Sequence, residues 1–377
     1  MTEQASPTQR VRLDNIQALR GVAALAVLFY HLALFIRGGV FVGQSGLPAG
    51  PWDQGWAGVD LFFVISGFIM VWTTQTISPS IKSSSAFLWR RVTRIYPLWW
   101  FCAAIMAVYF LWAYNMPAAP DRVAGPQEAW SYALKSFALW PQETPPLLGL
   151  GWTLVHEMWF YIVFAALLIL PRKYLVPSLV VWGALTALHY LLLGAVDQAQ
   201  ALRKLITSPL TLEFIGGALM TCVLIKWRDI PRNWGWGVFA IGLLWVSLAM
   251  IFNIRFLADD HHLTRTIVYG PAMFALVWGS TALALNGGLR VPNWLVRLGD
   301  WSYALYLIHY IVLIALKRIL LQFGWGEAGG SFAVFLFAVT AIVLSLTAAW
   351  MLHEVLEKPL IRFFRRREGR LPVQKSV

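Results

Sequence analysis

The sequence predicts an all-α integral membrane protein, a polytopic transmembrane helical bundle of about ten spans with both termini in the cytoplasm. Three observations predict this class. Of the 377 residues, 59% are hydrophobic and only 13% are charged, whereas soluble domains carry about 25% charged residues. Apolar runs of about 20 residues, the length that crosses a bilayer, recur along the chain. Basic residues gather on one side of alternate runs.

The ten predicted spans follow from the apolar runs and from the polar, glycine and proline residues that separate them. They cover residues 16–36, 58–77, 94–114, 151–170, 175–194, 209–225, 236–253, 266–285, 301–321 and 332–352. With the N-terminus inside, about two thirds of the 30 lysine and arginine residues lie on the inner side of the membrane. Because positive charge marks the cytoplasmic side, an even number of spans with cytoplasmic termini is predicted.

One membrane domain, residues 16–357, is expected between a short cytoplasmic N-terminus, residues 1–15, and a basic cytoplasmic tail, residues 358–377. Pro359 is expected to end the tenth helix. The net charge of +12 does not indicate a nucleic-acid partner, because the basic residues flank apolar spans. Their expected contacts are membrane lipids.

The two longer outer loops, residues 37–57 and 115–150, are rich in tryptophan, proline and glycine. They are too apolar for simple solvated connections, so we expect them to fold over the outer mouth of a cavity. The alternative is a belt of aromatic residues at the membrane interface.

The first span carries the most informative pair of polar residues, Arg20 and His31. Eleven residues at about 100° each make about three full turns, so both side chains point to the same side of the helix. They lie about 16 Å apart along its axis, with Arg20 near the cytoplasmic end and His31 toward the outer end. Because polar groups are expensive to bury in lipid, the pair is predicted to be functional.

Asp60 is the single charged residue of the second span and is expected at a depth close to that of His31. A carboxylate beside an imidazole fixes its tautomer and raises its basicity, which suits removal of a proton from a hydroxyl. The alternative is that Asp60 caps the helix N-terminus, where the dipole favours a negative charge.

Three arginines, Arg90, Arg91 and Arg94, precede and enter the third span on its cytoplasmic side. Arg91 and Arg94 share a helix face at a spacing of three. A guanidinium cluster is suited to bidentate binding of phosphates; the alternative is anchoring to lipid headgroups. Tyr96 and Pro97 are expected to position the helix entry.

The fourth and ninth spans add further candidates. Glu157 lies about two turns into the fourth span, where a carboxylate without a partner is costly, and its neighbour His156 points about 100° away. In the ninth span Ser302, Tyr306 and His309 share one face. His309 is either functional or hydrogen-bonded to a neighbouring helix.

Two other groups of polar residues have simpler interpretations. Glu354 and Glu357, at the inner end of the tenth span, are expected to pair with the arginines at 90–94. The cluster at 259–262, two aspartates and two histidines, is interpreted as a solvated outer loop, because no ligand spacing supports a metal. No metal site is predicted.

The motifs occur in a fixed order along the chain. Arg20-x10-His31 is followed by GVDLFFVISGF, RRVTRIYP, GWTLVHEMWFY and LGDWSYALYLIH. Together they resemble the membrane acyltransferase-3 family over residues 12–364, and GWTLxxEMxFY is most similar to its exopolysaccharide and nodulation-factor branch. The resemblance implies a ten-helix protein of the bacterial inner membrane. Such proteins move acyl groups, usually acetyl from acetyl-CoA, onto sugar hydroxyls.

The resemblance also implies roles for individual residues. Six positions match residues that the family uses for the reaction or for acyl-CoA: Arg20, His31, Asp60, Arg91, Arg94 and Glu157. The arginine and histidine of the first helix form an essential pair, the other two arginines belong to the acyl-CoA site, and the two acids match motif acids. Many members have two consecutive acids in the fourth-span motif, whereas Met158 follows Glu157 here.

These roles predict where the acyl donor binds. Acetyl-CoA is expected to enter from the cytoplasm with its phosphates on Arg91, Arg94 and Arg90, next to Tyr96. Its pantetheine arm is expected to run past Arg20, because an extended arm has about the length that separates Arg20 from the imidazole on the same helix.

The acceptor is expected from the outer side, as a polysaccharide or a lipid-linked sugar. His31, oriented by Asp60 or Glu157, is predicted to deprotonate its hydroxyl; a transient acetyl-His31 is the alternative. Two competing functions remain, a transporter or flippase for a lipid-linked sugar and a purely structural membrane partner.

Overall fold

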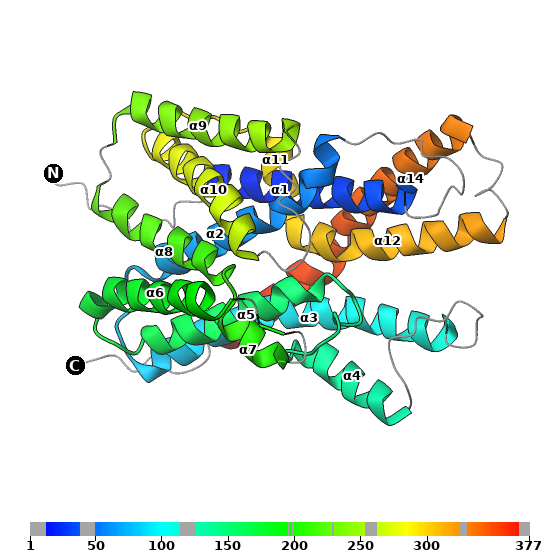
Figure 1. The fold of residues 1–377 in the computed structure, drawn as a ribbon, viewed down its shortest axis with the longest axis horizontal. Helices are drawn as coiled ribbons and strands as arrows, with labels where there is room; N and C mark the ends of the chain where they lie inside the picture. The colour runs from blue at the N-terminus through cyan, green and yellow to red at the C-terminus, as the bar shows by residue number, and fades with distance from the viewer. Residues whose placement is uncertain are drawn as a thin grey trace.

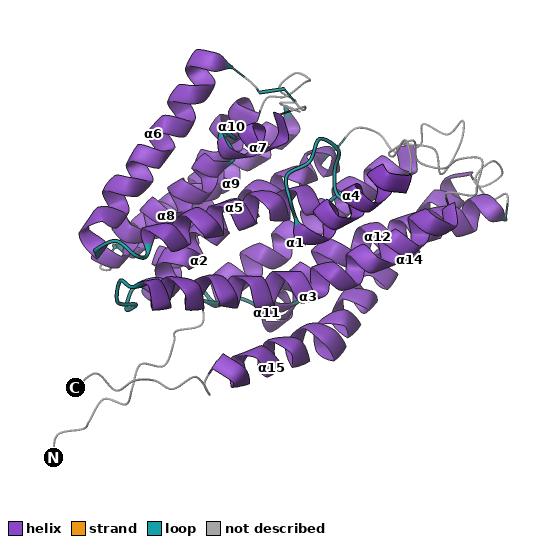
Figure 2. Cartoon of the chain, turned by 90° about the horizontal axis from the view of Figure 1, so that it is seen from below, coloured by secondary structure: helices purple, strands orange, loops and turns teal. Residues whose placement is uncertain are grey.

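The structure, a computed structural model, describes residues 13–37, 50–113, 126–194, 196–197, 200–227, 230–252, 262–323 and 330–368. Every regular element within these ranges is a helix, and Figure 2 draws only helices and loops there. The predicted all-α class is confirmed.

Ten helices form the body of the protein. They are α1 (Asp14–Phe35), α2 (Gly58–Thr74), α3 (Ile81–Ala113), α5 (Gly151–Leu167), α6 (Leu175–Leu193), α8 (Thr211–Lys226), α9 (Arg232–Ile251), α10 (His262–Leu285), α12 (Ser302–Gln322) and α14 (Gly330–Leu352). Shorter elements connect or extend them: η2 (Pro51–Ala57), α4 (Pro126–Ala138), η3 (Arg172–Tyr174), α7 (Ala201–Ile206), α11 (Asn293–Asp300), the π-helical turn η5 (His353–Glu357) and α15 (Lys358–Glu368).

These ten helices match the ten predicted spans one for one. Within the described residues, nine helical segments are long and apolar enough to cross a membrane. The tenth predicted span corresponds to α5, an apolar helix of 17 residues that falls just below that length. The chain is therefore a polytopic helical membrane protein, as predicted.

The largest difference from the predicted boundaries is at α3. The helix begins at Ile81, whereas the predicted span begins at residue 94, so the arginines lie within the helix. Hydropathy underestimates this helix because serine, lysine and arginine are polar but still compatible with helical backbone. Pro97 lies inside α3 and not at its entry.

A second boundary prediction was wrong. Pro359 does not end the last helix, because the chain continues through η5 into α15. The proline lies within a continuous helical segment, directly after the π-helical turn, whose different hydrogen-bond spacing accommodates its missing N–H. The π-helical turn before it separates the two helices.

The helix α1 packs against several other elements and keeps one apolar face exposed. It contacts η2, α2, α10, α11, α12 and α14. In Figure 1 most of these elements lie on one side of the molecule, α3 to α7 lie on the other, and α2 and α8 run between the two groups. Residues on the other faces of α1 are therefore enclosed by several helices.

The contact between α2 and α8 depends on two glycines. A Cβ atom at Gly67 would lie 1.9 Å from the carbonyl oxygen of Phe214, and one at Gly217 would lie 2.1 Å from that of Val64. Small residues let membrane helices approach closely enough for backbone contact. This close crossing fixes one wall of the cavity described below.

The two ends of the described chain meet at the same end of the bundle. Asp14, the first residue of α1, and Lys358, the first of α15, line one pocket together with residues of α11. An even number of membrane crossings requires this arrangement.

Candidate active site

A cavity opens at the seam between the two groups of helices. Residues from α1, α2, α3, α5 and α12 line it. Its polar lining consists of Arg20, Ser66, Arg91, Arg94, Thr153, Glu157, Tyr161, Ser302, Tyr303 and Tyr306. Four of the six motif positions named above, Arg20, Arg91, Arg94 and Glu157, thus surround one volume although they are far apart in the sequence. The other two, His31 and Asp60, do not line it.

Three arginines make this cavity electropositive. Arg20 donates to the side-chain oxygen of Gln17 at 3.2 Å, and Arg91 donates to the hydroxyl of Thr73 at 3.3 Å. The Arg91 guanidinium also lies over the ring of Tyr161, 5.6 Å from its centroid. With Arg94 they outnumber the single carboxylate in the lining, so the cavity is suited to an anion.

The other two residues predicted for donor binding do not line the cavity. Arg90 is exposed and does not line the cavity; it points about 100° away from Arg91 around the helix axis. Tyr96 donates its hydroxyl to the carbonyl oxygen of Ala138 at 2.8 Å and so holds the end of α4. The structure therefore brings Arg91 and Arg94 together with Arg20 but not with Arg90 or Tyr96.

Glu157 is the carboxylate of the cavity. Its Oε1 atom accepts two hydrogen bonds, one from the hydroxyl of Ser66 at 2.9 Å and one from the hydroxyl of Tyr161. Both partners also line the cavity. His156, its neighbour on α5, lines a different pocket, as the 100° rotation between adjacent helical residues requires.

His31 has a partner that sequence reasoning did not assign to it. Nε2 of His309, from α12, lies 3.3 Å from Nδ1 of His31, and the two ring centroids are 5.2 Å apart. His309 is completely buried, whereas His31 is partly exposed. The predicted interhelical hydrogen bond of His309 thus connects it to the imidazole of α1.

The backbone fixes the tautomers of this pair. Nδ1 of His31 lies 2.9 Å from the carbonyl oxygen of Val27, and Nδ1 of His309 lies 2.8 Å from that of Leu305. Because a carbonyl only accepts hydrogen bonds, the neutral rings carry their hydrogens on Nδ1. The Nε2 of His31 is then the unprotonated nitrogen, which is the form that a general base needs.

Tyr306 connects the cavity to the histidine pair. It lines the cavity, and its ring centroid is 6.3 Å from that of His309, one turn farther along α12. Its hydroxyl bonds to the Thr153 hydroxyl at 2.8 Å and to the carbonyl oxygen of Leu150 at 3.1 Å. The shared face of the ninth span therefore runs from the arginine-lined cavity to the histidines.

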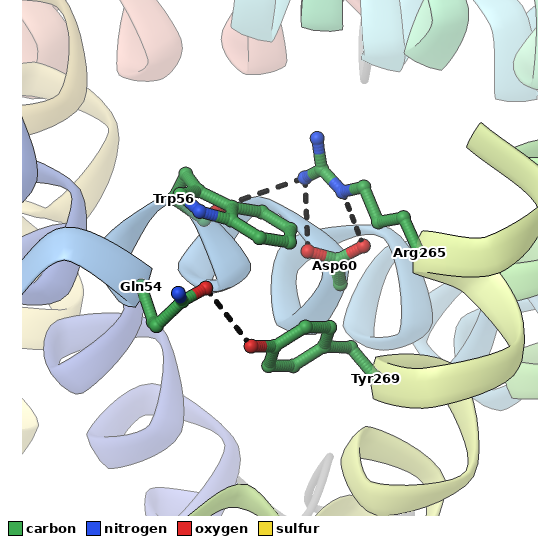
Figure 3. Close-up of polar contacts among 5 residues, drawn as sticks. All are labelled: Gln54, Trp56, Asp60, Arg265 and Tyr269. Carbon is green, nitrogen blue, oxygen red and sulfur yellow. Dashed lines mark hydrogen bonds and ion pairs between the residues drawn. The ribbon is translucent and has the colours of Figure 1, made fainter. Parts of the chain in front are cut away.

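The structure gives Asp60 a different partner from the predicted one. Figure 3 shows its carboxylate facing the guanidinium of Arg265 from α10, which donates to both oxygens at 2.7 and 2.9 Å. Asp60 is completely buried. Arg265 also donates to the carbonyl of Trp56 and lies over its ring, 4.6 Å from the centroid. No contact with His31 is found for Asp60 among the described residues.

Sequence reasoning missed two members of this charged group. Arg265 is 205 residues from Asp60 in the sequence and is not among the predicted site residues. Glu213, on α8, is completely buried and interacts electrostatically with Asp60 and Arg265. The available signal was an acid inside an apolar run, since such an acid needs a partner.

The remaining predicted polar groups are placed as follows. The predicted ion pairs of Glu354 and Glu357 with the arginines of α3 were wrong. Glu357 pairs with His353 at 2.7 Å, and Glu354 pairs with Lys358. Residues 259–261 of the acidic and histidine cluster lie outside the described residues, as do residues 38–49 of the first outer loop.

The described part of the second outer loop, residues 126–150, packs against the bundle. Leu147 and Leu148 are buried, whereas Trp140 is 57% exposed and lines a second pocket. The described part of the first loop, η2, also packs on α1, with Asp53 and Gln54 buried. The described parts of both loops therefore pack against the helical bundle.

Comparison with known proteins gives a consistent result. A family model described as an acyltransferase domain matches residues 13–354. The exopolysaccharide production protein ExoZ of Rhizobium meliloti (strain 1021) is 33% identical over 319 residues, which cover 82% of this chain and 90% of that protein. The acyltransferase MdmB of Streptomyces mycarofaciens is 26% identical over 397 residues, which cover 96% of this chain and 95% of that protein. No solved structure matches the chain. The matched region contains every residue of the cavity and both histidines.

Proposed function

Because the chain belongs to the acyltransferase-3 family of integral membrane acyltransferases, we propose that it transfers an acetyl group from cytoplasmic acetyl-CoA to a sugar hydroxyl. The acceptor is a cell-surface or exported polysaccharide or a glycolipid, and the membrane is the bacterial inner membrane. One observation carries the proposal: Tyr306 of the arginine-lined cavity and His309, the partner of His31, lie one turn apart on α12. The proposed donor site and the proposed base are thus neighbours inside the bundle.

The arginines form the donor side. The phosphates of acetyl-CoA carry several negative charges, and guanidinium groups bind them through paired hydrogen bonds. Arg91 and Arg94 supply these, while Arg20 guides the pantetheine arm into the bundle. Arg90 contacts the nucleotide end outside the cavity. The distance of about 16 Å from Arg20 to His31 along α1 fits an extended pantetheine arm.

His31 performs the proton transfer. Its Nε2 accepts the proton of the sugar hydroxyl as that oxygen forms a bond with the carbonyl carbon of the thioester. The carbon–sulfur bond then breaks, and the thiolate of CoA takes the proton from His31. The acceptor gains an ester, and no net proton is consumed.

His309 takes the orienting position that the sequence assigned to an acid. When His31 becomes an imidazolium, its Nδ1–H is shared between the carbonyl oxygen of Val27 at 2.9 Å and Nε2 of His309 at 3.3 Å. A buried neighbour that accepts this hydrogen bond stabilises the cation and keeps Nε2 directed at the substrate, as a carboxylate does in a hydrolase triad. Asp60, bound to Arg265, acts by holding α2 to α10.

An acetyl-His31 relay is the alternative chemistry within the same function. It differs from direct transfer because a covalent intermediate forms before the acceptor binds. Labelled acetyl-CoA in a single turnover without acceptor distinguishes the two. Label retained on wild-type protein and absent from His31→Ala indicates the relay, whereas unlabelled protein indicates direct transfer.

The acceptor class is supported by the names of the relatives. One of them is a protein of exopolysaccharide production, and it is 33% identical to this chain over 319 residues. Mass analysis of the surface glycans of a deletion strain identifies the modified sugar, which loses one acetyl group.

The test of the function is release of CoA thiol by purified protein in proteoliposomes. Wild-type protein is expected to release thiol in proportion to acetylated glycan. His31→Ala is expected to lower release by about 10²- to 10⁴-fold, the contribution of a general base. His189→Ala, in the lipid-side helix α6, is the matched control. Sugar movement without thiol release would instead identify a transporter.

A further inference from the structure

A second pocket lies on the other face of α5 and is not used by the mechanism above. We name it the outer pocket, because its walls are the loop at 140–146, the first turns of α5 and the helix α7. Its volume is about 320 Å³, within the range of small-molecule sites. Trp140, Trp152 and His156 supply its aromatic surface.

The outer pocket is next to the reaction cavity. Phe63 lines the cavity, and its ring centroid lies 6.4 Å from that of Trp152 and 6.3 Å from that of His156. Thr153 and Glu157 of the same α5 turns face the cavity. The two volumes are thus separated by one helix, α5, and by the ring of Phe63.

Two polar side chains in this pocket have unused hydrogen-bonding capacity. Ser208 is only 3% exposed, and its hydroxyl has no partner among the described residues. The amide of Gln142 donates to the Ser136 hydroxyl at 3.1 Å, but its carbonyl oxygen has no partner there. Buried polar atoms normally find partners. A ligand rich in hydroxyl groups would satisfy both.

The charge of the pocket argues against a phosphate or an anionic lipid headgroup. Arg265 is its most buried cation, and the carboxylate of Asp60 already binds it through two hydrogen bonds. The other charged residues of the lining are one lysine, Lys204, and one acid, Glu143. The lining therefore carries little net attraction for an anion.

We propose that the outer pocket binds an uncharged pyranoside unit of the acceptor, so that it is a sugar subsite beside the reaction cavity. Trp140 is 57% exposed, which leaves an indole face available for the apolar C–H face of a sugar ring. Gln142 and Ser208 bond to its hydroxyl groups. The inference rests on the proposed function for the identity of the acceptor but not for the binding itself.

The experiment measures binding and transfer separately. Oligosaccharides released from the surface polysaccharide of the producing cells are fluorescently labelled and titrated onto the protein in nanodiscs. Trp140→Ala is expected to weaken binding by at least about 10-fold, the magnitude of one lost aromatic stacking contact. The control is Trp130→Ala, because Trp130 is 73% exposed on α4 and does not line the pocket.

Ser208→Ala provides a second variant that does not depend on tryptophan. If the unpartnered hydroxyl has no ligand, its removal leaves binding unchanged. If it bonds to a sugar, binding weakens about 3- to 10-fold while the melting temperature stays the same or rises.

The outcomes of the two assays are distinguishable. If wild type releases thiol, and Trp140→Ala and Ser208→Ala bind the oligosaccharides as tightly as wild type, the subsite is overturned and the proposed function stands. Loss of binding in these variants without any thiol release overturns the proposed function and leaves a sugar site. Failure of the wild type to bind the oligosaccharides, or their displacement by glycerol 3-phosphate, overturns the subsite.

Discussion

At the scale of single residues, Nδ1 of His31 faces both the carbonyl oxygen of Val27 at 2.9 Å and Nε2 of His309 at 3.3 Å. Sequence reasoning offered Asp60 or Glu157, because acids orient imidazoles in many enzymes. In the structure Asp60 binds Arg265, Glu157 binds two hydroxyls in the arginine-lined cavity, and His309 contacts His31. A neutral imidazole thus replaces the expected carboxylate, and no buried negative charge is needed next to the base.

The histidine pair leads to a prediction for His309. His309→Ala is expected to lower kcat by about 10- to 100-fold and to leave KM for acetyl-CoA unchanged, because the residue orients the base and does not touch the donor. His309→Gln, which retains an acceptor for the Nδ1–H, is expected to recover part of the loss. Steady-state kinetics in proteoliposomes measures both constants.

Two results would contradict this role. If His309→Ala changes KM and kcat together with a lower melting temperature, the residue is structural. If His309→Ala retains full kcat, the imidazole of α1 works without this partner.

At the scale of elements, the charged pair between α2 and α10 is a structural device. Removing one partner of a buried ion pair leaves an unpaired charge and costs about 3–5 kcal/mol. Arg265→Gln and Asp60→Asn are therefore each expected to lower the melting temperature. The double variant is expected to be more stable than Arg265→Gln, because it leaves no unpaired Asp60. Additive losses in this double-mutant cycle would mean that the pair is not coupled.

The helix crossing of α2 and α8 makes a second prediction at this scale. Gly67→Ala is expected to destabilise the protein by about 1–3 kcal/mol or to prevent its folding, because the new methyl group overlaps the backbone of Phe214. Gly237→Ala is the matched control, since a methyl group there meets nothing within 4 Å. Thermal unfolding in detergent compares them, and equal melting temperatures would contradict the close crossing.

The elements also show what sequence patterns can predict. All ten spans were found because each is a continuous apolar run, and most boundaries agree within a few residues. The start of α3 and the continuation past Pro359 were missed, since polar helices leave no hydropathy signal. The arginines 91 and 94 were predicted from local spacing. Arg265 and Glu213 were not, because their partners are brought together only by tertiary packing.

At the scale of the whole molecule, the two ends of the helical bundle differ. The first and last described helices, α1 and α15, meet at one end of the bundle. The two outer loops cover the opposite end, and the outer pocket opens there. The proposed function places the first end in the cytoplasm, the side that positive charge favours. In that proposal the arginine-lined cavity receives its donor from the cytoplasm, and the acceptor approaches from the other side.

The most direct test is acetyl transfer across sealed membrane vesicles from cells that make the protein, with labelled acetyl-CoA added outside. Inverted vesicles, whose cytoplasmic face is outward, are expected to accumulate label on lumenal glycan. Right-side-out vesicles and inverted vesicles with His31→Ala are expected to remain unlabelled. Equal labelling in both orientations, or labelling that persists without His31, would contradict a path from a cytoplasmic donor through the arginine-lined cavity to His31.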